Sequence, residues 1–281
     1  MLQKVSITEK PTWDYYLNMN KKEVFSKLEN AYFSKDMHEK YIIRRLPSLL
    51  GDGKFFVDIS ASLGQYTHHI NKIMTQGKII AVEADPFRFE RLSENCRKWS
   101  DESSNSIDCI SAAVSDEEGR IAFYVTDSQI SGALYRHSLH YISKELSKTV
   151  NWREIEVDAI KLDSILQDRT PDLIKIDVEV TELRVLRGAR KLIKRGTTLF
   201  LIEVHDFHYP LGQDVADDVI GFMKGYGYYL NYFHGRCLFS RNLRLSIPLI
   251  WAYTRIPTLI CHLGRCCSQN YRKKPNNNEK M

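Results

Sequence analysis

The sequence lacks any uncharged run as long as the roughly 18 to 20 residues that a membrane-spanning helix requires. Met1–Trp13 also lacks the apolar stretch of a secretory signal peptide, so we expect a cytoplasmic protein. The six cysteines show neither the paired C-x-x-C spacing of a zinc site nor the density of a disulfide framework. No segment is repeated along the chain. Together these absences argue against secreted, zinc-stabilised and repeat proteins.

The 281 residues that are present suit one large α/β domain with an extension at each end. Hydrophobic residues make up 43% of the chain and charged residues 27%, which is ordinary for a globular protein with a sizeable core. We expect a helical N-terminal extension over residues 1–50 and a central domain over residues 51–245. The remaining residues, 246–281, form a basic and apolar tail whose end we expect to be disordered.

The net charge of +5 is concentrated near the C-terminus, because residues 236–281 hold nine Lys and Arg but a single acid, Glu279. A basic tail on a mildly acidic body does not suit a protein that coats nucleic acid, and we expect no nucleic-acid partner. Residues 246–267 mix Trp, Tyr, aliphatic residues and Arg, as interfacial segments do. Peripheral membrane contact is one interpretation of this segment, and packing on the domain or on a second subunit is the other. The oligomeric state is not readable from the sequence.

Short apolar runs alternate with amphipathic stretches through the centre of the chain. We expect strands at 55–59, 78–83, 107–113, 173–177 and 198–204, and helices at 21–33, 38–50, 65–74, 86–99 and 181–194. Two antiparallel strands, at 119–125 and 154–157, flank a long polar insertion, and a hairpin closes the domain at 226–232 and 236–239. This β-α alternation predicts a doubly wound α/β fold around a mostly parallel sheet. Long insertions in compact domains are often binding loops, so we expect the insertion at 126–153 to cover an acceptor.

In such a sheet, ligands bind beyond the carboxyl ends of the strands. The first strand contains Asp58 and leads into the small residues of the loop 60–64, and the second strand ends in Glu83. An acid at that second position can accept both hydroxyls of a ribose. The loop is not the G-x-G-x-x-G pattern of a pyrophosphate site, which favours a nucleoside without a diphosphate. A structural role for Asp58, a merely solvated Glu83 and a nicotinamide-dependent dehydrogenase stay open as alternatives.

Five segments in this arrangement resemble the FkbM family of methyltransferases, and the resemblance runs from about Phe55 to about His208. The segments are Val-Asp-Ile-Ser-Ala-Ser-Leu-Gly at 57–64, Ala-Val-Glu at 81–83, Ile-Lys-Ile-Asp-Val-Glu at 174–179, Val-Leu-Arg-Gly-Ala at 185–189 and Leu-Ile-Glu-Val-His at 201–205. The resemblance implies a seven-stranded, Rossmann-like methyltransferase fold with S-adenosyl-L-methionine as the methyl donor. It also implies O-methylation of a sugar or another small-molecule hydroxyl. The alternative is a catalytically degenerate methyltransferase fold that serves as a binding or scaffold protein.

That alternative is motivated by three departures from the family pattern. Ser60 and Val180 stand where the family usually has Gly, and Ser62 stands where it commonly has Asn. Ser60 keeps the loop small, so we expect donor binding to survive. Val180 is β-branched and disfavours positive φ, so its turn must follow a different path or a strained one.

The resemblance also implies roles for individual residues at the donor site. Three of them surround the amino-acid end of the donor: Asp58, Ser60 and Gly64. Glu83 holds the ribose hydroxyls, Ala113 and the neighbouring backbone line the adenine edge, and Asp177 lies close to the transferable methyl.

An alcohol acceptor benefits from a base that removes its proton, and three residues are candidates. They are Glu179, Glu203 and His205, of which we prefer His205 because the pKa of an unperturbed imidazole is near neutral. Alternatively, Glu179 charges the first turn of a helix and His205 belongs to an ordinary loop. We assign no metal, although Asp177, Glu203 and His205 together leave a metal site conceivable.

Overall fold

The computed structural model describes residues 40–126, 132–133, 152–204, 215–233 and 236–241. The chain divides into two compact units, residues 1–241 and 242–281, and all described residues lie in the first unit. The helix expected at 21–33 and the tail at 246–281 therefore lie outside the described residues. The three domain limits given above stay predictions.

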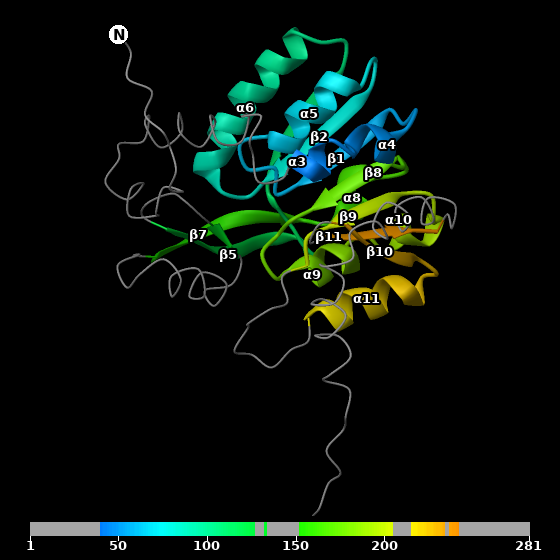
Figure 1. Ribbon diagram of the computed structural model, residues 1–281. Helices are drawn as coiled ribbons and strands as arrows, with labels where there is room; N and C mark the ends of the chain where they lie inside the picture. The colour runs from blue at the N-terminus through cyan, green and yellow to red at the C-terminus, as the bar shows by residue number, and fades with distance from the viewer. Residues whose placement is uncertain (1–39, 127–131, 134–151, 205–214, 234–235, 242–281) are drawn as a thin grey trace, which may run out of the picture. The chain divides into compact units, whose positions relative to one another are not determined.

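A seven-stranded sheet forms the centre of the first unit (Figure 1). Its order is β10-β11-β9-β8-β1-β2-β3. The strands are β1 (Phe55–Ile59), β2 (Lys78–Glu83), β3 (Ser106–Ser111), β8 (Leu173–Ile176), β9 (Leu199–Ile202), β10 (Tyr229–Phe233) and β11 (Arg236–Ser240). The five strands from β9 to β3 run parallel, while β11 is antiparallel to β9 and β10 is antiparallel to β11. The predicted doubly wound, mostly parallel α/β fold is confirmed.

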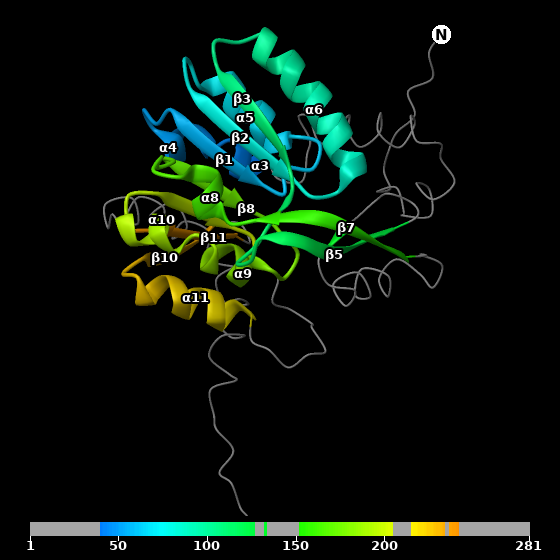
Figure 2. The same ribbon diagram turned by 180° about the vertical axis from the view of Figure 1, so that it is seen from behind.

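Helices cover both faces of this sheet, as Figures 1 and 2 show from opposite sides. The helices α5 (Gln65–Ile73) and α6 (Pro86–Asp101) lie on one face. The other face carries α8 (Leu162–Leu166), α9 (Glu182–Arg187), α10 (Arg190–Arg195) and α11 (Val215–Gly225). The chain leaves β1 toward β2 and β3, then returns to β8 on the other side, which places the switch of strand order between β1 and β8.

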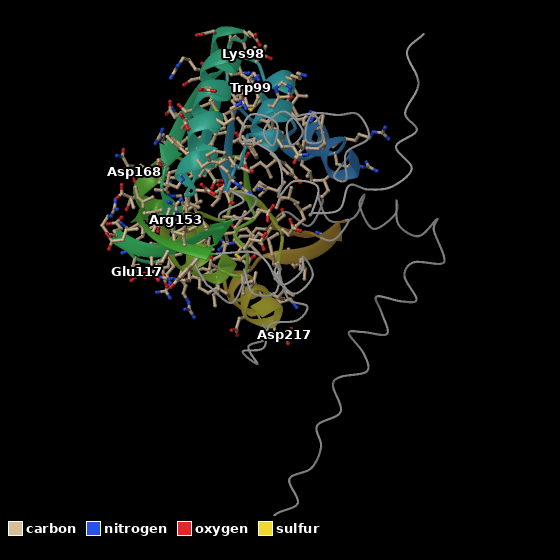
Figure 3. The ribbon with its side chains drawn as sticks, turned by 90° about the vertical axis from the view of Figure 1, so that its left-hand side faces the viewer. Lys98, Trp99, Glu117, Arg153, Asp168 and Asp217 are labelled. Carbon is tan, nitrogen blue, oxygen red and sulfur yellow. The ribbon has the colours of Figure 1, made fainter. Side chains whose placement is uncertain are left out.

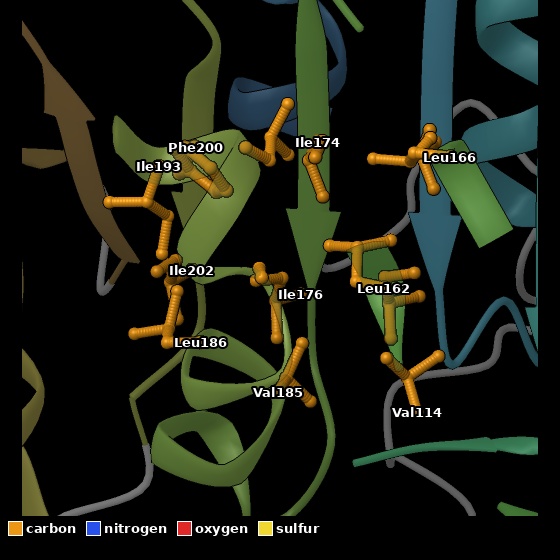
Figure 4. Packing of buried hydrophobic residues seen from close by; sticks show 14 of the residues in the cluster. Val114, Leu162, Leu166, Ile174, Ile176, Val185, Leu186, Ile193, Phe200 and Ile202 are labelled. Carbon is orange, nitrogen blue, oxygen red and sulfur yellow. The ribbon is translucent and has the colours of Figure 1, made fainter. Parts of the chain in front are cut away.

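The main hydrophobic core lies between the sheet and α8 to α11 (Figure 4). Every second strand residue points into it, including Ile174 and Ile176 of β8 and Phe200 and Ile202 of β9. Leu162 of α8 and further helix residues pack against them from the opposite side. The intervening residues of β1 and β8 point to the α5 and α6 side, and this alternation decides which side chains meet near the site.

The segment predicted as one strand at 107–113 in fact belongs to two sheets. The strand β3 ends at Ser111, and Ala113–Val114 forms a separate strand, β4, that pairs with β7 (Trp152–Ile160). The second sheet has the order β4-β7-β5-β6, where β5 is Gly119–Thr126 and β6 is Gly132–Ala133. The antiparallel pairing of β5 with β7 confirms the two strands expected around the insertion. The rest of that insertion, 127–131 and 134–151, lies outside the described residues.

Two helices predicted as continuous are interrupted. The helix expected at 38–50 is divided into α3 (Lys40–Ile43) and α4 (Leu46–Leu50), and Pro47 in the first turn of α4 cannot continue a preceding helix. The helix expected at 181–194 is divided into α9 and α10 at Gly188 and Ala189. There Asp163 accepts hydrogen bonds from the backbone N–H groups of Lys191 and Leu192 at 2.8 and 3.0 Å, and so caps the new helix from outside.

Charged side chains such as Lys98, Glu117 and Asp217 lie on the outside of the unit, and apolar side chains fill its interior (Figure 3). Within the part of the chain that the structure describes, no helix has both the length and the apolar character needed to cross a bilayer.

Candidate functional site

An open cavity of about 480 Å³ lies at the carboxyl ends of the parallel strands. The position is the one where open α/β sheets bind their ligands. Its wall comes from the ends of β1 and β2, from β4 and β5, and from the segment after β8. The lining residues are Ile59, Ser60, Glu83, Ala84, Arg88, Ala112, Ala113, Val114, Phe123, Val178, Glu179 and Thr181.

Glu83 is the buried acid of this wall, with an exposed fraction of only 4%. Its carboxylate accepts one hydrogen bond from the backbone N–H of Ser62, at 2.7 Å, and another from that of Asp85, at 2.9 Å. Burial raises the pKa of the Glu83 carboxyl, and the nearby guanidinium of Arg88 opposes that rise. A carboxylate offers about four acceptor positions, so both oxygens retain capacity for ligand hydroxyls.

Arg88 adds a positive charge to the same wall, from the first turn of α6. Its Nη1 donates to Ser62 Oγ at 3.3 Å, and its Nε lies 3.8 Å from Asp85 Oδ2. Asp85 in turn caps α6 by accepting from the backbone N–H of Phe87 at 2.9 Å. The start of α6 is therefore fixed to both the β1 loop and the β2 end.

The loop after β1 takes left-handed backbone conformations at three positions. The φ angles are 61° at Ser60, 53° at Ser62 and 90° at Gly64. Gly64 does not line the cavity: it precedes α5, and a Cβ there would come within 2.7 Å of the Trp99 ring. Gly64 thus allows α5 and α6 to pack closely, while Ser60 presents the loop to the cavity.

Asp58 is fully buried beneath this loop and is not among the lining residues. Its Oδ2 accepts from both the backbone N–H and the hydroxyl of Thr67, at 3.1 and 2.8 Å. Its Oδ1 lies 3.6 Å from the ammonium of Lys175, which stands directly opposite Asp58 in the β1–β8 register. Burial raises the pKa of Asp58, and Lys175 limits the rise.

The carboxylates predicted after β8 and β9 lie in three different settings. Asp177 follows β8, with a side chain 25% exposed, and its Oδ2 lies 3.4 Å from the Lys175 ammonium. Glu179 lines the cavity and has a φ angle of 50°, and the next residue, Val180, has a φ angle of 74°. Glu203 is half-buried, and its backbone N–H continues the β8–β9 pairing by donating to the Ile176 carbonyl at 2.9 Å.

The structure thus gathers Ser60, Glu83, Ala113 and Glu179 around one cavity. His205 lies outside the described residues. Within the described ranges, no three His, Cys, Asp or Glu side chains are placed to hold a metal ion. A metal site that includes His205 is therefore not tested.

Sequence reasoning missed two charged residues of this region, Lys175 and Arg88. A lysine within the apolar run of β8 was the available signal, because lysine is almost never fully buried unless it is paired. Arg88 gave no comparable signal, since an arginine in the first turn of a surface helix is unremarkable.

Comparison with known proteins identifies the family of the chain. Residues 58–230 match the Methyltransferase FkbM domain. The hexuronic acid methyltransferase AglP of Haloferax volcanii is 25% identical over 182 residues, which cover 63% of this chain and 67% of AglP. The 31-O-demethyl-FK506 methyltransferase FkbM of Streptomyces tacrolimicus is 26% identical over 204 residues, which cover 64% of this chain and 74% of that protein.

Among solved structures, a methyltransferase FkbM from Methylobacillus flagellatus is similar at 18% identity and a TM-score of 0.46. The alignment covers 67% of this chain and 43% of that one, so the chain spans less than half of that protein's length. Because the domain match from residue 58 to residue 230 spans well over half of the sequence, the chain belongs to the FkbM family of methyltransferases.

Proposed function

We propose that this protein transfers a methyl group from S-adenosyl-L-methionine to a hydroxyl of a sugar or another small molecule. The cavity at the ends of β1 and β2, with the buried carboxylate of Glu83 in its wall, carries the proposal. Glu83 can accept hydrogen bonds from two ribose hydroxyls, and Ile59, Val114 and Phe123 provide apolar walls that suit an adenine ring. The small side chains Ala84 and Ala113 leave room for the nucleoside.

The donor supplies an electrophilic methyl on its sulfonium, and the protein must orient the donor and receive a proton from the acceptor. Ser60 follows the end of β1 and Asp177 follows the end of β8, and these two strands are neighbours in the sheet. We assign Ser60 to the amino-acid end of the donor and Asp177 to the region of its methyl. Asp58 lies beneath the loop after β1 and supports the site indirectly, through its contacts with Thr67 and Lys175. In-line alignment of the two reactants supplies much of the acceleration in such a transfer.

For the proton, we propose His205 as the general base, with Glu179 and Glu203 as the alternatives. His205 stands two residues beyond Glu203, past the end of β9, which is the neighbour of β8. The acceptor class comes from the relatives, whose names specify a hexuronic acid and 31-O-demethyl-FK506. A hydroxylated sugar or natural product is therefore the acceptor that we propose for this chain.

Calorimetric titration with S-adenosyl-L-methionine, with S-adenosyl-L-homocysteine and with NAD tests the donor half of the proposal. We expect the first two to bind and NAD not to bind. Binding of none of the three would instead support a scaffold protein built on a methyltransferase fold, and binding of NAD alone would support a dehydrogenase.

The variant Glu83→Gln should weaken donor binding by about 10- to 100-fold, because hydrogen bonds to a charged group contribute roughly 1.5–3 kcal/mol each. Glu94→Gln is the matched control, since Glu94 lies on the exposed side of α6 and pairs at the surface with Arg91. Equal affinity in both variants would remove Glu83 from the donor site.

Transfer of a labelled methyl group to a panel of hexuronic acids, neutral glycosides and macrocyclic alcohols tests the acceptor half. With any accepted compound, His205→Gln should lower turnover by about 10²- to 10⁴-fold, the usual contribution of a general base. Donor affinity should not change. Full turnover in this variant would transfer the role to Glu179 or Glu203.

A further inference from the structure

Lys175 is a buried cation at the boundary between the core and the candidate donor site. It lies in β8 between two fully buried isoleucines, Ile174 and Ile176, and its own exposed fraction is 4%. Because strand residues alternate, Lys175 points away from the main core and toward the side of the sheet that holds α5. An ammonium group at such a position must be held by several partners, since burying it alone costs several kcal/mol.

The partners of Lys175 come from three separate parts of the fold. Its Nζ donates to the Ser60 carbonyl at 3.0 Å, on the loop after β1. It lies 3.6 Å from Asp58 Oδ1 in β1 and 3.4 Å from Asp177 Oδ2 after β8. The ammonium also lies 5.2 Å from the centre of the Tyr66 ring on α5, within the range of a cation–π interaction. One charge therefore joins the two strand ends that flank the switch point.

The three polar partners of Lys175 differ in how far their positions depend on the lysine. Asp58 has two further hydrogen bonds from Thr67, so its position is fixed without Lys175. The Ser60 turn has a φ angle of 61°, a conformation that a serine does not favour, and a bond to its carbonyl helps to hold it there. Asp177 lies beyond the end of its strand and is 25% exposed, so an ion pair restricts where its carboxylate can lie.

We infer that Lys175 is a positioning residue for methyl transfer, which holds the Asp177 carboxylate and the Ser60 turn in place for the donor without touching the donor itself. This inference rests on the function proposed above. It assigns the buried pair of Lys175 and Asp58 to the support of the site as well as to the stability of the core. The lysine has a fixed anchor on one side, Asp58, and two groups that it orients on the other.

A double-mutant cycle on donor affinity tests the inference. Binding of S-adenosyl-L-methionine is measured by calorimetry in the unmodified protein, in Lys175→Met, in Asp177→Asn and in the variant with both changes. We expect each single change to weaken binding by about 10-fold or more, and the loss in the double variant to be smaller than the product of the two single losses. Such non-additivity is the signature of residues that act as one unit. A lysine with only a structural role would give losses that multiply.

Lys78→Met is the matched control. Lys78 also forms a cross-strand ion pair with an aspartate, Asp108, at 2.6 Å, but at the start of β2 and with both side chains partly exposed. We expect its donor affinity to equal that of the unmodified protein. If Lys175→Met fails to fold, the same cycle is measured in an Asp58→Asn background, which leaves no buried carboxylate without its cation.

The outcomes separate the inference from the proposed function. If the unmodified protein does not bind the donor, the proposed function fails first. If it binds, and the folded Lys175→Met protein binds equally well, the inference fails while the function stands. The inference also fails if Asp177→Asn has no effect, because the Lys175 ion pair then holds no carboxylate that the donor needs, or if the two losses multiply.

Discussion

Positive φ angles at residues other than glycine are concentrated in the two loops beside the cavity. Ser60 and Ser62 have φ angles of 61° and 53° in the first loop, and Glu179 and Val180 have φ angles of 50° and 74° in the second. Three of these positions are the departures from the family pattern noted in the sequence. The strained alternative expected for Val180 is therefore the one that the structure shows.

Replacing Val180 with Gly should stabilise the protein by about 1 kcal/mol. A β-branched residue at positive φ costs of order 1–3 kcal/mol, which the glycine variant would recover. The greater conformational freedom of glycine in the unfolded chain offsets part of this stabilisation. Urea unfolding at equilibrium measures the change. Gln76→Gly is the control, because Gln76 has a φ angle of 55° without β-branching and should gain less. A Val180→Gly protein less stable than the parent would mean that the valine side chain contributes more than the strain removes.

The Asp58–Lys175 pair should make stability depend on pH. Burial raises the pKa of Asp58 above its unfolded value, so the folded state binds this proton more tightly. Stability from this group is therefore present below an unfolded pKa of about 4 and is lost as the pH rises through the folded pKa. Lys175 and Asp177 are the charged groups that act on Asp58, and the lysine limits the loss.

In Lys175→Met the folded pKa of Asp58 should rise further, so the variant should lose more stability at pH 8 than at pH 5. At pH 8 we expect a loss of about 3 kcal/mol, typical of a buried pair that lacks one partner. Urea unfolding at both pH values measures this difference. In an Asp58→Asn background, the loss caused by Lys175→Met should differ little between pH 5 and pH 8. An equal loss at the two pH values in Lys175→Met alone would contradict the assignment.

At the scale of elements, local sequence patterns predicted the strands of the main sheet but not the place where the chain leaves that sheet and pairs in the second one. β1 and β2 have the predicted bounds, because each is an apolar run preceded by a turn that contains glycine. The segment 107–113 was predicted as one strand because its change of sheet at Ala112 depends on pairing with β7, about fifty residues away. α11 received no prediction, although its acidic first turn, Asp217 and Asp218, is a usual sign of a helix start.

The candidate site follows the same division. Ser60 and Glu83 could be predicted to line the cavity because ligands bind beyond the carboxyl ends of parallel strands. Applying this rule requires only the position of each strand and the direction of the chain along it. The setting of Asp58 and the role of Lys175 depend on the β1–β8 register, which joins residues more than a hundred positions apart. Sequence reasoning therefore located the cavity but missed the charge that connects its two sides.

Gly188 lies at the division between α9 and α10 and gives a prediction for these elements. A Cβ at this position would lie 2.1 Å from the backbone carbonyl of Ser115, so Gly188→Ala must displace the backbone between the two sheets. We expect a loss of about 3 kcal/mol, the upper range for overpacking. Gly221→Ala in α11 is the control, because no atom lies within 4 Å of its added Cβ and the helix should gain about 0.5–1 kcal/mol. Urea unfolding of both variants should give opposite signs, and two stabilised proteins would contradict the close approach at Ser115.

For the molecule as a whole, the described residues that line the donor cavity come from the two sheets, from α6 and from the segments that follow β1, β2, β3 and β8. The insertion is joined to the second sheet, where Ala133 and Gly132 pair with Tyr124 and Val125 of β5. The expected role of the insertion, covering the acceptor, therefore stays a prediction that can be tested separately from donor binding.

Replacing residues 134–151 with a flexible Gly-Ser linker of about eight residues should leave donor affinity within about twofold while abolishing methyl transfer to any acceptor. The reason is that Glu83, Ser60 and their hydrogen-bond partners all belong to the main sheet and its first two crossovers, which the change does not touch. Calorimetry with S-adenosyl-L-homocysteine measures the first quantity, and transfer of a labelled methyl group measures the second. If donor binding disappears in a variant whose β5–β7 pairing is intact by unfolding and circular dichroism, the insertion belongs to the donor site. If transfer persists at the parent rate, the acceptor is held elsewhere, and the segment after β9 that carries His205 becomes the next part of the chain to replace.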